Sequence, residues 1–121
     1  MNRVPDFLIR RIYKKGSLKE TTDGISFELK NILGPGNITG INFIKINEDL
    51  YDASVIKFIS SNIQVLAKQV SSENPMLIKF NQEATCLLEG AKGLQAGLNK
   101  IIIEIMSQDI GQVQVTLTDT L

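Results

Sequence analysis

The sequence predicts an all-β fold, an antiparallel β-sandwich of the immunoglobulin-like kind, and two observations carry this prediction. Apolar and polar residues alternate with a period of two in several segments, as in strands with one buried face. Turn-forming residues recur at intervals of roughly 8 to 12 residues, which is typical of sandwiches and barrels. The length of 121 residues, at 13.4 kDa, fits one domain, so we expect residues 1–121 to form a single sandwich domain.

Two segments alternate most clearly, residues 24–29 and 111–119. We expect both to be half-buried strands whose apolar side chains face the core, namely Ile25, Phe27, Leu29, Val113, Val115 and Leu117. Residues 101–106 are apolar at every position except Glu104, a pattern typical of a strand covered on both faces. The loop over residues 107–111 should return this strand antiparallel to the last one.

The remaining strands are expected at residues 8–13, 41–46, 54–59, 76–80 and 84–89. The dipeptide Asp23-Gly24 is the strongest turn signal, because glycine accepts a positive φ, and it should fold residues 18–21 back onto residues 25–29.

Residues 61–70 allow two interpretations. Ser61 could cap a short helix near residues 62–70, with Ile63, Leu66, Ala67 and Val70 on one face. The same residues also allow a strand over residues 63–67.

Residue chemistry restricts the function. The sequence contains no histidine, so histidine-ligated zinc, serine–histidine triads and histidine acid–base catalysis are excluded within this chain. Cys86 is the single cysteine and lies in the apolar run 84–88, so we interpret it as a buried hydrophobic side chain in a reducing compartment. No two carboxylates can be assigned as a catalytic pair. We therefore expect no catalytic residue, no cofactor, no bound metal and no activity of the chain alone.

Hydropathy and charge suggest where the chain works and what it could bind. No stretch approaches the roughly 18 apolar residues of a transmembrane helix, so we expect a cytoplasmic location and no membrane contact. The net charge is zero, yet residues 1–19 carry six basic residues and one acidic residue. This basic arm, which includes Arg10, Arg11, Lys14 and Lys15, could bind nucleic acid or an acidic partner. A strand pair with solvated charges is the favoured interpretation, because Tyr13 is the only aromatic residue nearby that could stack on a base.

Two loops have residues that could bind a ligand, but a structural role is the favoured interpretation of both. Residues 34–40 (GPGNITG) resemble a phosphate-binding glycine loop, but a strand-like segment follows them where a helix is needed, so we expect a connection between two sheets. The oxygen-bearing residues Asn47, Glu48, Asp49 and Asp52 could hold a hard cation. Their order departs from an EF-hand, and we expect a hairpin loop with solvated carboxylates.

Glycines at positions 90, 93 and 97 permit close approach of another backbone. If the chain docks on a larger enzyme, we expect the partner to contact this loop and residues 34–40, with Leu94 as the apolar anchor, Asn37 as the polar one, and Gly93 and Gly97 giving access. The favoured interpretation of Leu94 is the simpler one, in which it folds inward and caps the sandwich. Without a larger partner, we expect a homo-oligomer, with a dimer as the leading state, because edge strands need protection and two-fold symmetry is the commonest.

Residues 41–106 resemble the small β-sandwich subunit of C-glycoside deglycosidases, which accompanies a larger catalytic barrel subunit. Three stretches carry the resemblance: Ile44–Glu48, Phe80–Ala84, and Gly93–Gly97 followed by the strand Lys100–Ile105. The last is the most specific, and none is a catalytic signature. The turn after Ile46 lacks the glycine of that family, and aromatic residues are sparse. The resemblance implies the sandwich fold and an accessory role, and no active-site residue.

The amino-terminal block VPDFLIRRIYKKGSLKETTDGISFELKN and the ending GQVQVTLTDTL are similar to a group of small, stand-alone microbial proteins. Some of that group carry the name hydroxymethylglutaryl-CoA reductase. The residues give that name no support, because such a reductase needs a nicotinamide site, a catalytic histidine and several times this length.

These observations lead to a non-catalytic accessory subunit that supports a larger sugar- or glycoside-acting enzyme. The alternatives are a module that binds nucleic acid or an acidic partner through the basic arm, a small protein with no catalytic role of its own, and a small enzyme that uses carboxylates alone.

Overall fold

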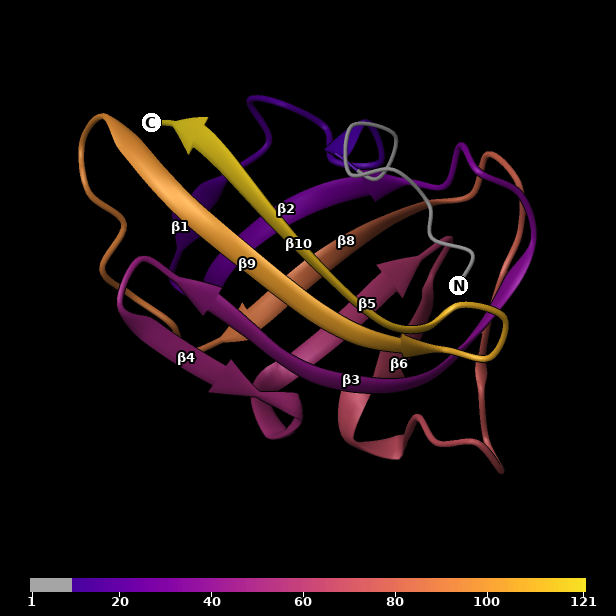
Figure 1. The fold of residues 1–121 in the computed structure, drawn as a ribbon. Coiled ribbons are helices and arrows are strands. Elements are labelled where there is room, and N and C mark those ends of the chain that lie inside the picture. The colour runs from indigo at the N-terminus through magenta and orange to yellow at the C-terminus, as the bar shows by residue number, and fades with distance from the viewer. Residues whose placement is uncertain (1–9) are drawn as a thin grey trace.

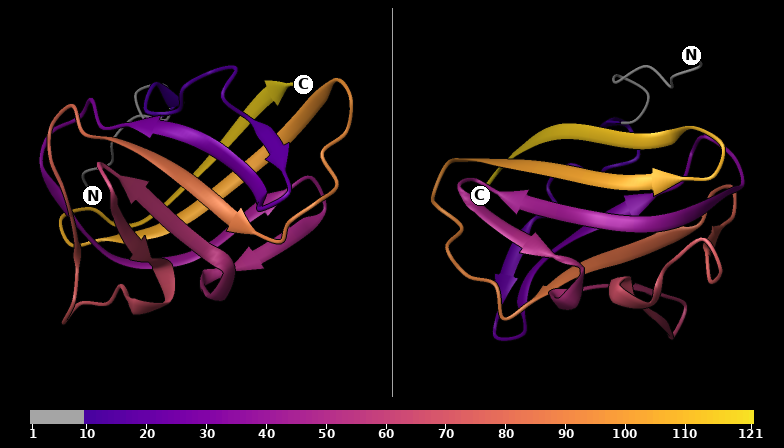
Figure 2. Two further views of the ribbon diagram at one scale, coloured as in Figure 1. Left: turned by 180° about the vertical axis from the view of Figure 1, so that it is seen from behind. Right: turned by 60° about the horizontal axis from the view of Figure 1, so that its bottom comes forward.

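The computed structural model describes residues 10–121, and its strands form two antiparallel sheets packed face to face (Figure 1). The first sheet, sheet A, runs in the order β1 (Lys19–Thr21), β2 (Gly24–Lys30), β8 (Glu83–Glu89), β5 (Ile56–Ser60) and β6 (Ile63–Leu66). Sheet B runs in the order β10 (Gly111–Thr120), β9 (Leu98–Ser107), β3 (Gly36–Ile46) and β4 (Asp49–Asp52), and β7 (Met76–Ile78) pairs with the start of β3. Figure 2 shows the two layers from further sides. The predicted all-β, antiparallel sandwich is confirmed.

The first hairpin forms where the turn signal predicted it. Thr21 pairs with Gly24, which leaves Thr22 and Asp23 as a two-residue loop between β1 and β2. Gly24 has a φ of +143°, and a Cβ atom there would lie 2.0 Å from the carbonyl oxygen of Leu88. Only glycine fits this position without displacing β8.

Residues 61–70 form a strand and a short 3-10 turn, so the helix near residues 62–70 is wrong and the strand alternative is right. Ser61 and Asn62 both have positive φ, 47° and 70°, and they join the paired residues Ser60 and Ile63. Positive φ at both central residues is the geometry of a two-residue hairpin turn. The turn directs Ile63 into β6, and the 3-10 turn η2 (Ala67–Gln69) follows.

The predicted pairing of β9 with β10 is confirmed, whereas the prediction that other parts of the fold cover both faces of β9 is wrong. β9 and β10 pair antiparallel from Leu98 with Thr120 to Ser107 with Gly111. Val115 and Leu117 are buried while Gln114 and Thr116 are exposed, as predicted. Sheet A covers one face, and the apolar residues of the other face are half-buried because β9 lies between β10 and β3 within sheet B.

Several predicted boundaries shift. The start of the expected strand over residues 8–13 lies outside the described residues, and Tyr13 forms only an isolated bridge with Leu29. The segment expected over 54–59 begins with the 3-10 turn η1 (Ala53–Val55) before β5. The connection expected over 34–40 is shorter, because residues 36–40 already belong to β3 and only residues 31–35 cross between the sheets.

The best-packed part of the core lies at the end of the sandwich that faces residues 90–97. Its side chains are almost completely buried and come from both sheets: Ile25, Ile46, Ile56, Leu88 and Ile101. No helical segment within residues 10–121 has the length and hydropathy that crossing a bilayer requires.

Candidate functional site

A cavity of about 730 Å³ lies between the two sheets, at the end where β7 pairs with the start of β3. Both sheets line it with side chains of their inner faces, namely Leu29, Phe58, Ala84, Ile38, Ile41, Ile103, Ile105, Val113, Val115 and Leu117. The volume lies within the range of small-molecule sites, roughly 300 to 1,000 Å³.

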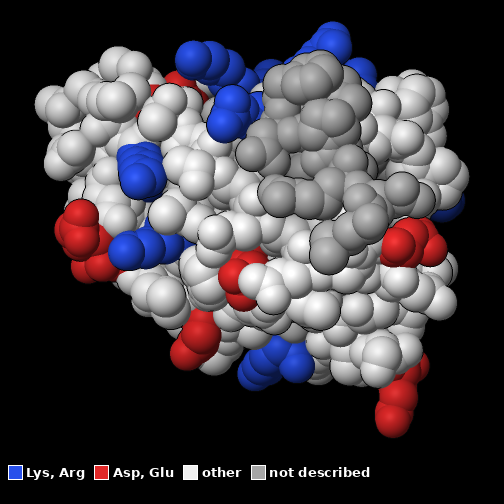
Figure 3. Space-filling model, in the orientation of Figure 1, with Lys and Arg blue, Asp and Glu red and all other residues white. Residues whose placement is uncertain are grey.

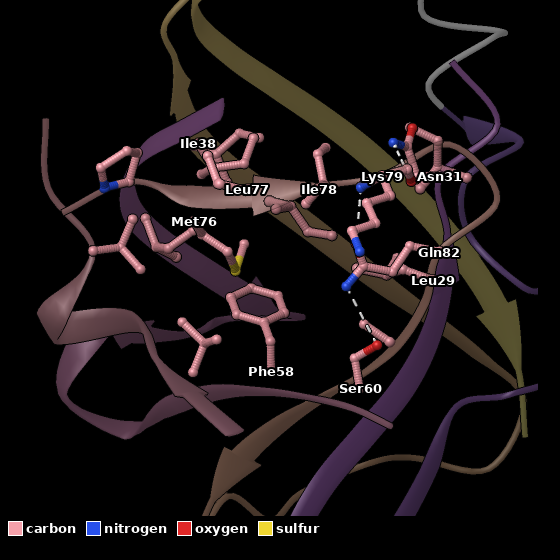
Figure 4. A pocket seen from close by; sticks show the side chains of 18 of the residues that line it. Leu29, Asn31, Ile38, Phe58, Ser60, Met76, Leu77, Ile78, Lys79 and Gln82 are labelled. Carbon is pink, nitrogen blue, oxygen red and sulfur yellow. Dashed lines mark hydrogen bonds between the residues drawn. The ribbon is translucent and has the colours of Figure 1, made fainter. Parts of the chain in front are cut away.

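The segment between β6 and β8 forms the third wall. β6 has four residues and β7 has three, so residues 67–75 leave the sheets where longer strands would have closed the gap. Met76 and Ile78 are half-buried and pack against the core. Figure 4 shows the Met76 side chain directed toward the ring of Phe58. The cavity is therefore a consequence of two short strands facing long ones.

Asn31 fixes the polar end of the cavity. Its side-chain Nδ2 donates to the carbonyl oxygens of Gly34 at 2.7 Å and Lys79 at 2.9 Å, and its Oδ1 accepts from the Leu33 backbone at 3.1 Å. Its backbone also exchanges hydrogen bonds with the turn at residues 81 and 82. A buried amide that satisfies both of its ends in this way ties two connecting loops into one rim.

Gln82 and Ser60 present hydrogen-bonding groups beside the apolar walls. Gln82 Oε1 accepts from the Lys79 backbone at 2.8 Å, and Gln82 Nε2 donates to Ser60 Oγ over a long 3.3 Å. Ser60 Oγ in turn donates to the Glu83 carbonyl at 2.6 Å. An amide nitrogen carries two hydrogens, so within the described residues Gln82 keeps a donor for a ligand (Figure 4).

The walls carry little charge. Lys79 is the single charged residue among those that line the cavity, and it is exposed at the rim. Burial, together with the hydrogen bond to Asp119, raises the pKa of Tyr13 far above its ordinary value, so the phenol stays neutral near pH 7. Such walls favour holding an apolar molecule over acid–base chemistry.

Tyr13 also closes one side of the sandwich. Its hydroxyl donates to Asp119 Oδ2 at 2.6 Å, and the Gly16 backbone donates to the same oxygen at 2.8 Å. Burial raises the pKa of Asp119, but the hydrogen bonds from Tyr13, Gly16 and Thr120 outweigh it and hold the pKa below its ordinary value. This carboxylate joins the first described residues to the last strand, and the sequence analysis missed it because 106 residues separate the pair.

Three large apolar side chains are exposed near the rim. Ile63, Leu77 and Phe80 are 66%, 65% and 57% exposed, and the first two also line the cavity. Large apolar residues in short segments flanked by polar residues are the one sequence signal that could have indicated the open end of the cavity.

The predicted partner-contact residues lie elsewhere and are not brought together. Leu94 is half-buried and packs against the core, while Glu20 Oε1 accepts from the backbones of Gly93 at 2.9 Å and Leu94 at 3.1 Å. Gly97 accepts from the buried side chain of Asn99, which holds this loop at the closed end. Asn37 stands at the start of β3, near the opposite end, and donates to Gln108 Oε1 at 2.7 Å. Contact of these residues with a partner stays a prediction.

The described part of the basic arm is exposed, and the acidic loop forms a hairpin turn. Arg10, Arg11, Lys14 and Lys15 are exposed, and Lys14 lies 3.6 Å from Glu28. Asn47, with a φ of 55°, and Glu48 form the two-residue hairpin loop between β3 and β4, as predicted. Across residues 10–121, no group of three or more acidic or cysteine side chains is placed to hold a metal ion.

Fold and cavity together define a β-sandwich domain with an apolar chamber between its sheets. The chain belongs to the family described as hydroxymethylglutaryl-CoA reductase, N-terminal domain, whose sequence model matches residues 8–121. No curated protein matches the chain significantly.

This family membership corrects the sequence analysis. The resemblance to the C-glycoside deglycosidase subunit is wrong, and with it the accessory role beside a sugar- or glycoside-acting enzyme. Two of the stretches that carried it have structural roles here: Glu20 and Asn99 hold residues 93–97, and residues 80–84 form a turn at the cavity rim that leads into the start of β8. The interpretation that the residues give the reductase name no support is also wrong. The missing histidine excludes a histidine-dependent reaction in this chain, whereas the family match is to an N-terminal domain. The binding module built on the basic arm gains no support either.

Proposed function

We propose that this chain is a binding domain that holds an aliphatic molecule between its two sheets. The observation that carries the proposal is the cavity of about 730 Å³ with walls of isoleucine, leucine, valine, phenylalanine and methionine. Burying one methylene group in such walls contributes about 0.8 kcal/mol, so a chain of several carbons gains enough to bind. The ligand's polar end would lie at Gln82 and Ser60, with the exposed Lys79 beside it.

The substrate in the family's name fits this chamber poorly. A hydroxymethylglutaryl group carries a hydroxyl and a carboxylate on a short carbon skeleton, so it would bring polar groups against the apolar inner walls, where they would lose their hydrogen bonds to water. A long aliphatic chain with its polar group at one end would keep that group at the rim, beside Lys79. We therefore propose a fatty acid or another linear aliphatic chain with one polar end as the ligand class.

The family description also motivates a proposal about partners. An N-terminal domain of a reductase would work beside a larger catalytic part, so we propose that this chain associates with such an enzyme. Coexpression with a reductase catalytic part, followed by size-exclusion chromatography, tests this, and separate elution of the two at micromolar concentration would contradict it. The single cysteine, which is a buried free thiol, accords with a cytoplasmic location, which we also propose.

Binding is tested with the fluorescent fatty acid cis-parinaric acid and two variants of neighbouring residues on β8. Ala84 lines the cavity, so Ala84→Phe should fill part of it and weaken binding at least tenfold. Thr85 lies on the opposite face of the same strand, so Thr85→Phe adds similar bulk outside the cavity and should leave binding unchanged.

Saturable binding by the unchanged protein, lost only in Ala84→Phe, is the expected result. Thermal melts of both variants show whether each remains folded. Absence of saturable binding to the unchanged protein, or equal binding by a folded Ala84→Phe protein, would sink the proposal.

A further inference from the structure

Strand β10 is the longest edge strand of the described fold. The other edge strands, β1, β7, β6 and β4, have three, three, four and four residues, whereas β10 has ten, from Gly111 to Thr120. It pairs with β9 on one side, and no strand within residues 10–121 pairs with its other side. Alternate residues of an antiparallel edge direct their N–H and C=O groups away from the sheet, so this edge offers hydrogen bonds along its length.

This edge lacks the devices that usually protect an exposed strand. Its sequence, GQVQVTLTDT, contains no lysine, no arginine and no proline, and its pairing with β9 runs without a bulge. The single charge, Asp119, points inward and accepts from Tyr13 and Gly16. The β4 edge, by contrast, carries Asp49 and Asp52 within four residues. Within the described residues, charged side chains therefore protect the β4 edge of sheet B, and the β10 edge has no such protection.

The edge is also complementary to itself. An antiparallel strand can pair with an identical strand across a two-fold axis, provided that no like charges meet. On the described part of the face that fronts Figure 3, basic and acidic side chains are scattered, and neither sign gathers into one large patch. Val113 and Val115 alternate with Gln112 and Gln114, so the apolar and polar rows of one copy would each continue in the other.

We propose that two copies of this chain form a dimer in which the β10 strands pair antiparallel, with Gln114 opposite the partner's Gln114. This register joins the two four-stranded paths of sheet B into one continuous sheet of eight strands. It sets Val113 against the partner's Val115, a pair of β-branched side chains of the kind that stabilises sheets. It uses residues 111–117 and leaves the end of β10, where Gly16 binds Asp119, untouched. The dimer does not depend on a ligand in the cavity.

Engineered cysteines test both the dimer and its register. Opposed residues of an antiparallel pair have Cα atoms about 4.5 to 5.5 Å apart, within the range that a disulfide spans. Gln114→Cys should therefore form a disulfide-linked dimer under mild oxidation. Thr118→Cys lies on the same face of the same strand but would sit opposite the partner's Ile110, so it should stay monomeric on a non-reducing gel. The native thiol, Cys86, is fully buried and does not compete.

Light scattering and hydrogen exchange complete the experiment on the unchanged chain. The expected mass at micromolar concentration is twice 13.4 kDa, and the outward-facing amides of residues 111–117 should lose protection on dilution. A monomeric mass would overturn the proposal. So would slow exchange of these amides in a monomer, because another part of the same chain would then cover the edge. A dimer in which Gln114→Cys fails to cross-link would overturn it as well.

Discussion

The two ends of the sandwich are built from the same residue types and differ in how closely the sheets approach. Ile101 and Ile103 lie two positions apart on one face of β9, yet Ile101 is fully buried and Ile103 is half-buried beside the cavity. At the closed end, the buried Asn99 ties the loop over residues 90–97 to the sheets, whereas at the open end β6 and β7 are too short to close the gap. Strand length, rather than composition, decides which end is solid and which end is hollow.

The largest expected contrast comes from truncating an isoleucine to alanine at each end of the sandwich. Ile101→Ala should destabilise the protein by about 2 to 5 kcal/mol, because it opens a cavity in packed core. Ile103→Ala should cost clearly less, since its side chain already borders empty space. Chemical denaturation of both variants measures the difference. Equal losses would mean that the open end is packed as densely as the closed end in solution.

The next contrast concerns the amide network of the closed end. Asn99 Nδ2 donates to the carbonyl oxygens of Gln95 and Gly97, and its Oδ1 accepts from Gln95 N and Asn47 Nδ2. Asn99→Ala removes all four hydrogen bonds in a buried place and should cost about 2 to 3 kcal/mol. Asn42→Ala is the control, because Asn42 is exposed and its side chain hydrogen-bonds only Glu104 within the described residues. A loss no greater than that of the control would show that the loop is held by other contacts.

A comparable amide, Asn31, ties loops at the open end, so sequence alone could not tell the two ends apart. Period-two alternation correctly predicted β2 and β10, because each strand alternates apolar side chains facing the core with polar side chains on the other face. It left helix and strand open over residues 61–70, because the hairpin turn made by Ser61 and Asn62 contains no glycine to mark it. It could not predict the cavity, because alternation says which face of a strand is inward and is silent on the distance to the opposite sheet.

A smaller effect is expected where Tyr13 closes the side of the sandwich. Tyr13→Phe removes the hydroxyl that donates to Asp119 and should cost about 1.5 to 2 kcal/mol at pH 7. The pKa of Asp119 is lower in the folded than in the unfolded protein, where it is about 3.9. Its contribution is therefore complete well above pH 4 and is lost as the pH falls through the folded value. Thermal melts from pH 7 to pH 2 should show the gap between the unchanged protein and Tyr13→Phe narrowing on acidification. A gap that stays constant would show that the carboxylate is not the acceptor that matters.

The last prediction compares how fast a thiol reagent reaches the packed core and the cavity, and it involves the smallest expected loss of stability. Cys86 is fully buried, and burial raises its pKa, so it should react slowly in the native protein and rapidly in denaturant. Cys86→Ala should cost only about 1 kcal/mol, because it removes one sulfur atom. In that background, Val113→Cys places a thiol on the half-buried wall of the cavity. It should react much faster than Cys86 does in the native protein, and an aliphatic ligand should slow it. If Val113→Cys proves as inert as Cys86, the cavity is closed to solvent and reagent alike, and a ligand would need an opening motion of residues 67–82 to enter.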